Sequence, residues 1–122
     1  MVRMVPSGLI DLTHRANLQL RGVKRGAPGA VADRLCALGL ADADVTREGR
    51  PPVLVAPCWQ AGDDTEGIAT ELLSRLDELP ALPPKFGFAV DAGPAPVLAV
   101  APADVRIGRA RSGGLVVGAD GD

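Results

Sequence analysis

Glycine and proline recur throughout this chain and limit the length of its secondary structure. The 122 residues include 15 glycines and 11 prolines, spread along the whole sequence. Both residues favour turns, so their spread indicates short elements joined by many turns and argues against low-complexity disorder. Because 47% of the residues are hydrophobic, the default expectation is one compact domain that buries roughly two-thirds of its unfolded surface.

Charge is nearly balanced overall but unevenly distributed. The net charge of −2 gives no indication of nonspecific nucleic-acid binding. Residues 1–25 contain five basic residues and one acidic residue, whereas residues 63–78 contain one basic residue and six acidic ones. The N-terminal surface is therefore expected to face an anion. Nucleic acid is not an expected partner, because the chain has few aromatic side chains for base stacking: Trp59, Phe86 and Phe88.

The cysteines and the hydropathy pattern exclude several classes. Cys36 and Cys58 lie 22 positions apart, and two cysteines without a Cys-x-x-Cys pair are too few ligands for a zinc site or an iron–sulfur cluster. Both have apolar neighbours, which predicts that both side chains fill the core. There is no apolar run of ~18 residues and no charged-then-apolar leader. We therefore expect a cytoplasmic protein with no membrane partner and no metal-ligand set.

The first third of the chain predicts a strand, a second strand and a helix. Residues 8–13 and 17–23 read as strands, with 14–16 as a turn or a bulge. Val31, Leu35 and Leu38 fall on one helical face, and Gly39 stands where a C-terminal cap belongs. The pattern predicts a helix over 28–38, followed by a polar connection over 41–52.

The rest of the chain predicts a sheet with one further helix. Residues 53–57 read as a buried strand, and Asp63 with Glu66 forms a capping-box pattern at the start of a helix that the prolines of 80–84 end. Four more short strands are predicted over 86–90, 96–100, 104–108 and 114–118. The expected class is α+β, a sheet covered by two helices.

Four polar residues stand at every second position of the stretch 12–22 and, if this stretch is extended, suggest a binding surface. Side chains alternate across a strand, so Leu18 and Leu20 are expected to point into the core while the polar row lies on the other face. Guanidinium groups match carboxylates and phosphates in two-point contacts, so the row is either an anion-binding face or an ordinary solvated one. Its members are Arg15, Asn17, Gln19 and Arg21.

Three other residues have competing interpretations. Lys85, at a strand entry, is either an anion contact or an exposed edge lysine. His14 is either an acid or base beside an anion or a turn histidine, and the turn is favoured. Asp91 is either a ligand or a turn former, and again the turn is favoured. The sequence contains no phosphate loop, nucleophile elbow or two-histidine metal helix, and it identifies no catalytic residue.

The stretch LIDLTHRANLQLRGV resembles the motif of the ferredoxin-like half domain of nitrite and sulfite reductases. Thr13, Arg15, Gln19 and Gly22 occupy the motif positions, and Arg21 fits variants with arginine before the glycine. The resemblance implies a strand that faces sirohaem, a tetrapyrrole rimmed with carboxylates. It further implies a partial half domain of strand, strand and helix over 1–45, and over 46–122 the beginning of a mixed α/β sheet domain of the iron–sulfur and sirohaem type.

Within that family the sequence is most similar to the precorrin-3B synthases. RANLQLRGV, VLVAP and LPPKFGFAVD follow one another as they do in those enzymes. Lys85 matches the first lysine of the third motif, and Gly87 replaces the second lysine of sulfite reductases. The resemblance implies an oxidoreductase of cobalamin biosynthesis that hydroxylates a tetrapyrrole with dioxygen and closes a lactone. The implied tetrapyrrole contacts are Arg15, Asn17, Gln19, Arg21 and Lys85.

The chain also departs from that family. The four-iron four-sulfur cluster of the family is held by two cysteine pairs downstream of KFGFAVD, and these pairs are absent. We therefore expect a fragment that is inactive alone, has the remainder of the enzyme as a partner chain, and self-associates through exposed apolar edges. The alternatives are a fragment of a sirohaem-dependent reductase, which Gly87 disfavours, and a non-catalytic module that binds tetrapyrroles or other anions.

Overall fold

The computed structural model describes residues 9–83 and 85–119, so position 8 of the first predicted strand and position 84 of the proline stretch lie outside the described residues. The described chain divides into two compact units, one of residues 9–13 and 17–50 and one of residues 14–16 and 51–119. Within the described ranges, no helix has the length and apolar character needed to cross a membrane.

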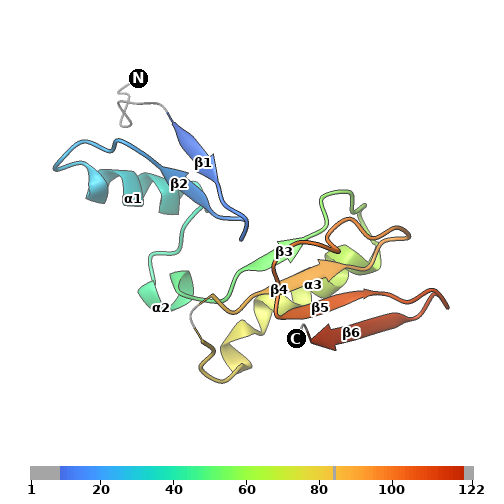
Figure 1. Cartoon of the computed structure of the whole chain (residues 1–122). Helices are drawn as coiled ribbons and strands as arrows, with labels where there is room; N and C mark the ends of the chain where they lie inside the picture. Colours follow the sequence, from blue (N-terminus) through green and yellow to red (C-terminus); the bar gives the residue numbers. More distant parts are fainter. Residues whose placement is uncertain (1–8, 84, 120–122) are drawn as a thin grey trace. The chain divides into compact units, whose positions relative to one another are not determined.

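The first unit contains an antiparallel hairpin (Figure 1). Strands β1 (Ile10–Leu12) and β2 (Leu18–Leu20) confirm the two predicted strands in shorter form, and residues 14–16 form the turn between them. Ile10 pairs with Leu20 and Leu12 with Leu18, so one face of the hairpin is apolar.

The prediction that Leu18 and Leu20 point into a core is wrong. Leu18 is 57% exposed, Leu12 is 81% exposed and Leu20 is half-buried, and the unit has no buried residue among those described. The physical reason is that, among the described elements of this unit, none packs against the hairpin. A two-stranded hairpin alone cannot enclose a core.

Helix α1 (Pro28–Ala37) confirms the predicted helix to within one residue. Proline stands in its first turn, where its missing N–H costs no hydrogen bond. Gly39 takes a positive φ of 68°; its N–H donates to the Cys36 carbonyl at 3.0 Å, and the Leu40 N–H donates to the Leu35 carbonyl at 2.9 Å. This pair of bonds is a Schellman motif, so the predicted glycine cap is confirmed.

A short helix, α2 (Val45–Glu48), interrupts the stretch predicted to be a polar connection. Asp44 caps it by accepting from the Thr46 N–H at 2.9 Å, and the Glu48 carboxylate accepts from the Asp42 N–H at 2.7 Å. Backbone hydrogen bonds to the Asp44 carboxylate lower its pKa. Two of the acidic residues that make the segment polar therefore stabilise the helix: Asp44 is its N-cap, and Glu48 binds the backbone that leads into it.

The second unit is built on a four-stranded mixed sheet in the order β3-β4-β5-β6 (Figure 1). Strands β3 (Val53–Val55), β4 (Phe88–Asp91) and β5 (Val105–Arg109) are parallel, and β6 (Leu115–Ala119) is antiparallel to β5. These strands confirm four of the predicted ones and the mixed α and β class.

The core of this unit surrounds β4. Phe88, Ala89 and Val90 are all buried, and Val90 has 0% exposure. Helix α3 (Asp64–Ser74) packs on β3 and β4 and is followed by a 3-10 turn, η1 (Leu76–Glu78). Thr65, 1% exposed, accepts from the Ala92 N–H at 3.1 Å and so ties the start of α3 to the end of β4.

The prediction of a strand over 96–100 is wrong, because backbone N–H and C=O groups of this segment are hydrogen-bonded to side chains and not to a neighbouring strand. The Asp91 carboxylate accepts from the N–H groups of Val97 and Leu98, at 2.7 Å each, and Arg106 donates to the Leu98 carbonyl at 2.8 Å. Leu98 and Ala101 pack instead against a buried cluster of Leu54, Ala89 and Ala103.

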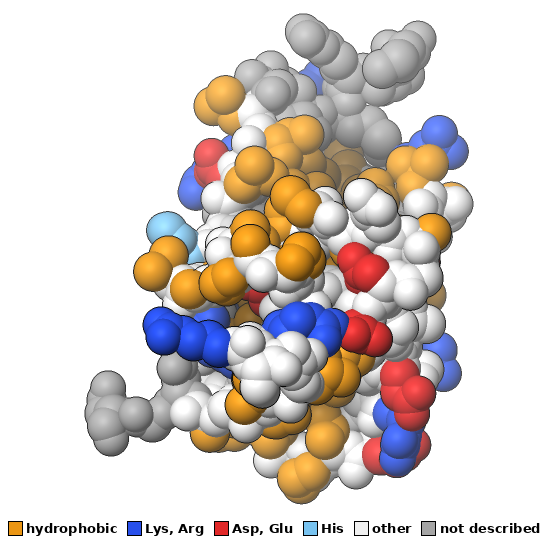
Figure 2. All heavy atoms as spheres, turned by 90° about the vertical axis from the view of Figure 1, so that its right-hand side faces the viewer, with side chains coloured by type: hydrophobic (Ala, Val, Ile, Leu, Met, Phe, Trp, Pro, Cys, Tyr) orange, Lys and Arg blue, Asp and Glu red, His pale blue; other side chains and the backbone are white. Residues whose placement is uncertain are grey.

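The expectation of one sheet covered by two helices is also wrong. Helix α1 belongs to the unit with the hairpin, and only α3 and η1 accompany the four-stranded sheet in the described chain. All of β6 is exposed, and hydrophobic side chains remain at the surface on the side of the molecule shown in Figure 2.

The start of α3 confirms the predicted cap. Asp63 accepts from the Glu66 N–H at 3.0 Å and from the Gln60 N–H at 2.9 Å. The Glu66 carboxylate reaches one residue further back than a capping box requires and accepts from the Gly62 N–H at 2.7 Å. The two bonds from the backbone N–H groups, that of Gln60 first, lower the pKa of Asp63.

We expect Asp63→Ala to lower the melting temperature by roughly 4–8 °C at neutral pH, because two N–H groups lose their acceptor. The folded-state pKa of Asp63 lies below its ordinary value of 3.8, so its stabilising effect is present above that value and is lost as the pH falls through the folded-state pKa. Thermal melts followed by circular dichroism should show the difference between native protein and variant shrinking in acid. A difference that stays constant with pH would show that the carboxylate is not the stabilising group.

Candidate functional site

The hairpin places three of the predicted contacts on one face. Gln19 pairs with Asp11 across the hairpin, and alternation puts Asn17 and Arg21 on the same side as Gln19. Arg21 Nε donates to the Asp11 carboxylate, and Arg21 Nη2 donates to Gln19 Oε1 at 3.3 Å. The hydrogen bond and the charge of Asp11 raise the pKa of Arg21. The Arg21 guanidinium thus already has a carboxylate partner.

Thr13 and Gly22 have structural roles at the ends of this face. The Thr13 hydroxyl accepts from the Asn17 N–H at 3.1 Å, and the Thr13 N–H donates to the Asn17 carbonyl at 2.9 Å, which closes the hairpin turn. Gly22 adopts a positive φ of 74°, a conformation that other residues reach only with strain. Both motif positions are therefore explained by backbone geometry.

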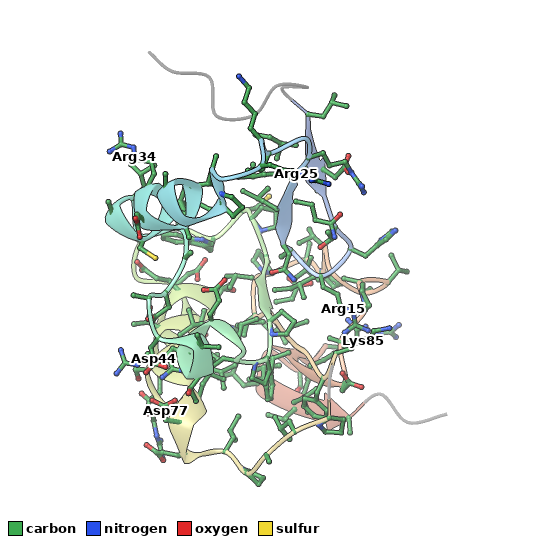
Figure 3. All side chains as sticks on the ribbon, turned by 90° about the vertical axis from the view of Figure 1, so that its left-hand side faces the viewer. Arg15, Arg25, Arg34, Asp44, Asp77 and Lys85 are labelled. Carbon is green, nitrogen blue, oxygen red and sulfur yellow. The ribbon has the colours of Figure 1, made fainter. Side chains whose placement is uncertain are left out.

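Arg15 does not lie on the strand, which corrects the predicted row of four. It sits in the turn His14–Ala16, where Ala16 has a positive φ of 57°, and this turn groups with the second unit. The half-buried Arg15 side chain donates from Nη1 to the carbonyl oxygen of Lys85, 70 residues away in sequence (Figure 3). The structure thus brings together residues from two separate motifs.

Lys85 lies in a tight turn just before β4. It adopts a positive φ of 74°, its side chain is exposed, and the Phe86 N–H donates to the Pro83 carbonyl at 3.1 Å. Phe86 and Phe88 stack edge to face with ring centroids 5.4 Å apart. The turn therefore presents the ammonium group to solvent while the aromatic pair fixes the start of the strand.

Gly87 marks a close approach of three segments. A Cβ built on this buried glycine would lie 3.5 Å from Pro52 Cγ and 3.9 Å from Arg15 Nη1. These are ordinary van der Waals distances, so a Cβ would fit, but a longer side chain would start at a buried position beside Pro52 and Arg15. Burial disfavours a charged side chain such as a second lysine at this position.

Asp104 anchors the turn from the other side and was not singled out by the sequence. Its carboxylate accepts from the Gly87 N–H at 2.8 Å, and its own N–H donates to the Gly87 carbonyl at 2.8 Å. Asp104 is 17 residues from Gly87 in the sequence, so only the parallel pairing of β4 with β5 brings the two together. The one sequence signal was its place at the start of a predicted strand.

The remaining candidates have structural explanations. His14 is exposed in the hairpin turn, as the favoured interpretation predicts. Asp91 stabilises the loop after β4. Its carboxylate accepts hydrogen bonds from the N–H groups of Val97 and Leu98, further along the chain than the predicted turn directly after Asp91. The core prediction is wrong for Cys58, which is exposed, while Cys36 is half-buried.

The chain does not supply the ligands of an iron–sulfur cluster. A four-iron four-sulfur cluster takes four cysteine thiolates, and the sequence contains two cysteines, one in each unit. In addition, the described residues contain no grouping of three or more histidine, cysteine, aspartate or glutamate side chains able to hold a metal ion. By contrast, the exposed cation of Lys85 and the guanidinium of Arg15 suit carboxylates.

A hollow of about 520 Å³ lies apart from these residues, beside α3. It is open and largely apolar, and it is flanked by the ion pairs of Arg75 with Glu71 and Glu78. The Arg75 guanidinium lowers the pKa of Glu78. None of the predicted tetrapyrrole contacts lines this hollow, so we do not assign the anion-binding site to it despite its volume.

Comparison with known proteins gives no match: no family model, no curated protein and no solved structure is similar to this chain at a significant level. A function can therefore be inferred only from the residues themselves.

We expect Asp104→Ala to destabilise the protein by about 1–3 kcal/mol, because the buried Gly87 N–H loses its acceptor. Asp104→Asn keeps an acceptor oxygen and should cost less. Urea unfolding of the two variants measures the difference. Equal losses of stability in both would show that this hydrogen bond does not hold the turn.

Proposed function

We propose that this chain contributes basic contacts to the carboxylates of a tetrapyrrole, as part of an oxidoreductase of the precorrin-3B synthase type in cobalamin biosynthesis. The main support for this proposal is the hydrogen bond that Arg15 donates to the Lys85 carbonyl. Arg15 comes from the Thr-x-Arg motif and Lys85 from the LPPKFGFAVD motif, and a tetrapyrrole site requires both motifs to meet.

The chemistry of the two cations suits a polycarboxylate. A guanidinium has five N–H donors, more than the bond to one carbonyl requires, and binds a carboxylate through two parallel bonds. The Lys85 ammonium is a flexible point charge on an exposed side chain. Together they can hold neighbouring carboxylates on the rim of one macrocycle.

Gly87 favours the precorrin-3B synthase type over a sirohaem-dependent reductase. Gly87 is buried, and burial disfavours a second charged lysine there, the residue that sulfite reductases use near their oxyanion substrate. The tetrapyrrole is then the substrate, and no second cation for a small oxyanion is required.

Asn17, Gln19 and Arg21 are proposed as further contacts on the hairpin. Asn17 and Gln19 have exposed side chains, whereas a ligand carboxylate must compete with Asp11 for Arg21. These residues do not include the cysteines for the cluster, so we propose no electron-transfer role for them. The role of this chain alone is binding and orientation.

We expect Arg15→Ala and Lys85→Ala each to weaken binding of a polycarboxylate porphyrin by about tenfold, the equivalent of about 1.4 kcal/mol for one lost charged contact. Fluorescence titration of the porphyrin measures the affinity. Arg34→Ala, on α1 and outside both motifs, is the matched control and should bind like the native chain.

Two further results bear on this prediction. A porphyrin with its carboxylates esterified should not bind, because the proposed contacts are ionic. The thermal melt of Lys85→Ala should change little, since this side chain is exposed and surface substitutions usually shift stability by about 0.5 kcal/mol or less. Unchanged affinity in both Arg15→Ala and Lys85→Ala would remove the site; equal loss in Arg34→Ala would reduce it to nonspecific charge attraction.

A further inference from the structure

Strand β6 forms one edge of the four-stranded sheet and has no neighbour on its outer side in the described chain (Figure 1). Its sequence, LVVGA, contains no charged residue and no proline, and every residue in it is exposed. Leu115 is 52% exposed and Val117 is 68% exposed. Proteins usually protect such an edge with lysine, proline or a bulge, because it offers its backbone to another strand.

The hydrogen-bond pattern shows which backbone groups of β6 are available. In an antiparallel pair, bonded and non-bonded residue pairs alternate. The Ala110 N–H donates to the Gly114 carbonyl at 2.8 Å, so the pair Ala110 and Gly114 is bonded and the next pair, Arg109 and Leu115, is not. The outward-facing backbone groups therefore belong to Leu115, Val117 and Ala119.

These outward positions fit a second copy of the same strand. If two β6 strands pair antiparallel about Val117, each Val117 faces the other, and Leu115 faces Ala119 of the other copy. All outward positions then meet outward positions, Leu115 opposes the small Ala119, and no charged side chains face each other. A two-fold axis through this pair gives an isologous interface.

The opposite edge of the sheet does not offer the same surface. Strand β3 has three residues, and Pro51 and Pro52 precede it while Pro57 follows two residues after it. Proline has no N–H to donate, and short strands bracketed by prolines resist further pairing. Pairing of β6 with β3 of another copy, which would build an open filament, is therefore disfavoured.

We propose that two copies of this chain form a closed dimer by antiparallel pairing of β6 with β6, which joins two four-stranded sheets into one continuous sheet. The side chains of Leu115, Val117 and Ala119 from both copies then lie on one face across the two-fold axis. This inference rests on the geometry of the edge and is independent of the tetrapyrrole site.

The test is the mass of the full chain in solution, measured by sedimentation over a range of concentrations. The native chain should reach twice the monomer mass. Val117→Lys places two ammonium groups opposite each other at the axis and should shift the chain to monomer. Val100→Lys is the matched control, because Val100 is 98% exposed in the loop before β5, and this variant should remain dimeric.

A cross-link tests the register even if the lysine variant folds poorly. With Cys36 and Cys58 replaced by alanine, Val117→Cys should form an intermolecular disulfide under mild oxidation, whereas Val100→Cys should not. A native chain that is monomeric at all concentrations, a Val117→Lys variant that stays dimeric, or assembly into larger species would each overturn the proposal. Equal cross-linking of both cysteine variants would do the same.

Discussion

The second unit depends on the burial of β4 and on its pairing with a parallel strand on each side. Val90 has no exposed surface, and its neighbours in β4 contact α3 on one face and the loop that contains Leu98 on the other. The hydrogen-bond ladder starts where the Phe88 N–H donates to the Pro52 carbonyl at 2.9 Å. Because this start is fixed, the turn that contains Lys85, three residues before Phe88, also has a fixed position.

The candidate site is a consequence of this arrangement. Gly87 is held by Asp104 from β5's side and by Pro52 from β3's side, and it lies next to the Arg15 guanidinium. The same contacts that begin the sheet therefore place two cations from distant parts of the sequence together. Only Phe86 and Gly87 separate the exposed Lys85 from the first residue of the buried strand β4.

Sequence reasoning succeeded where structure is set by neighbours in the chain. The Schellman cap at Gly39 and the Asp63 cap of α3 were readable because each involves residues fewer than six positions apart. It failed where a side chain competes with the sheet: Asp91 removes Val97 and Leu98 from a predicted strand. Of the predicted site, alternation placed Asn17, Gln19 and Arg21 correctly on one side. The contact of Arg15 with Lys85 spans 70 residues and was beyond any local rule.

The proposed function requires that Arg15 and Lys85 form a carboxylate-binding surface. Two-dimensional ¹H–¹⁵N NMR of the full chain during addition of a polycarboxylate porphyrin tests this residue by residue. The signals of Arg15, Lys85 and Gly87 should shift progressively with porphyrin concentration, while those of the buried end of α3, around Thr65 and Ala69, should stay in place. Shifts confined to other parts of the chain, or no shifts at all, would contradict it.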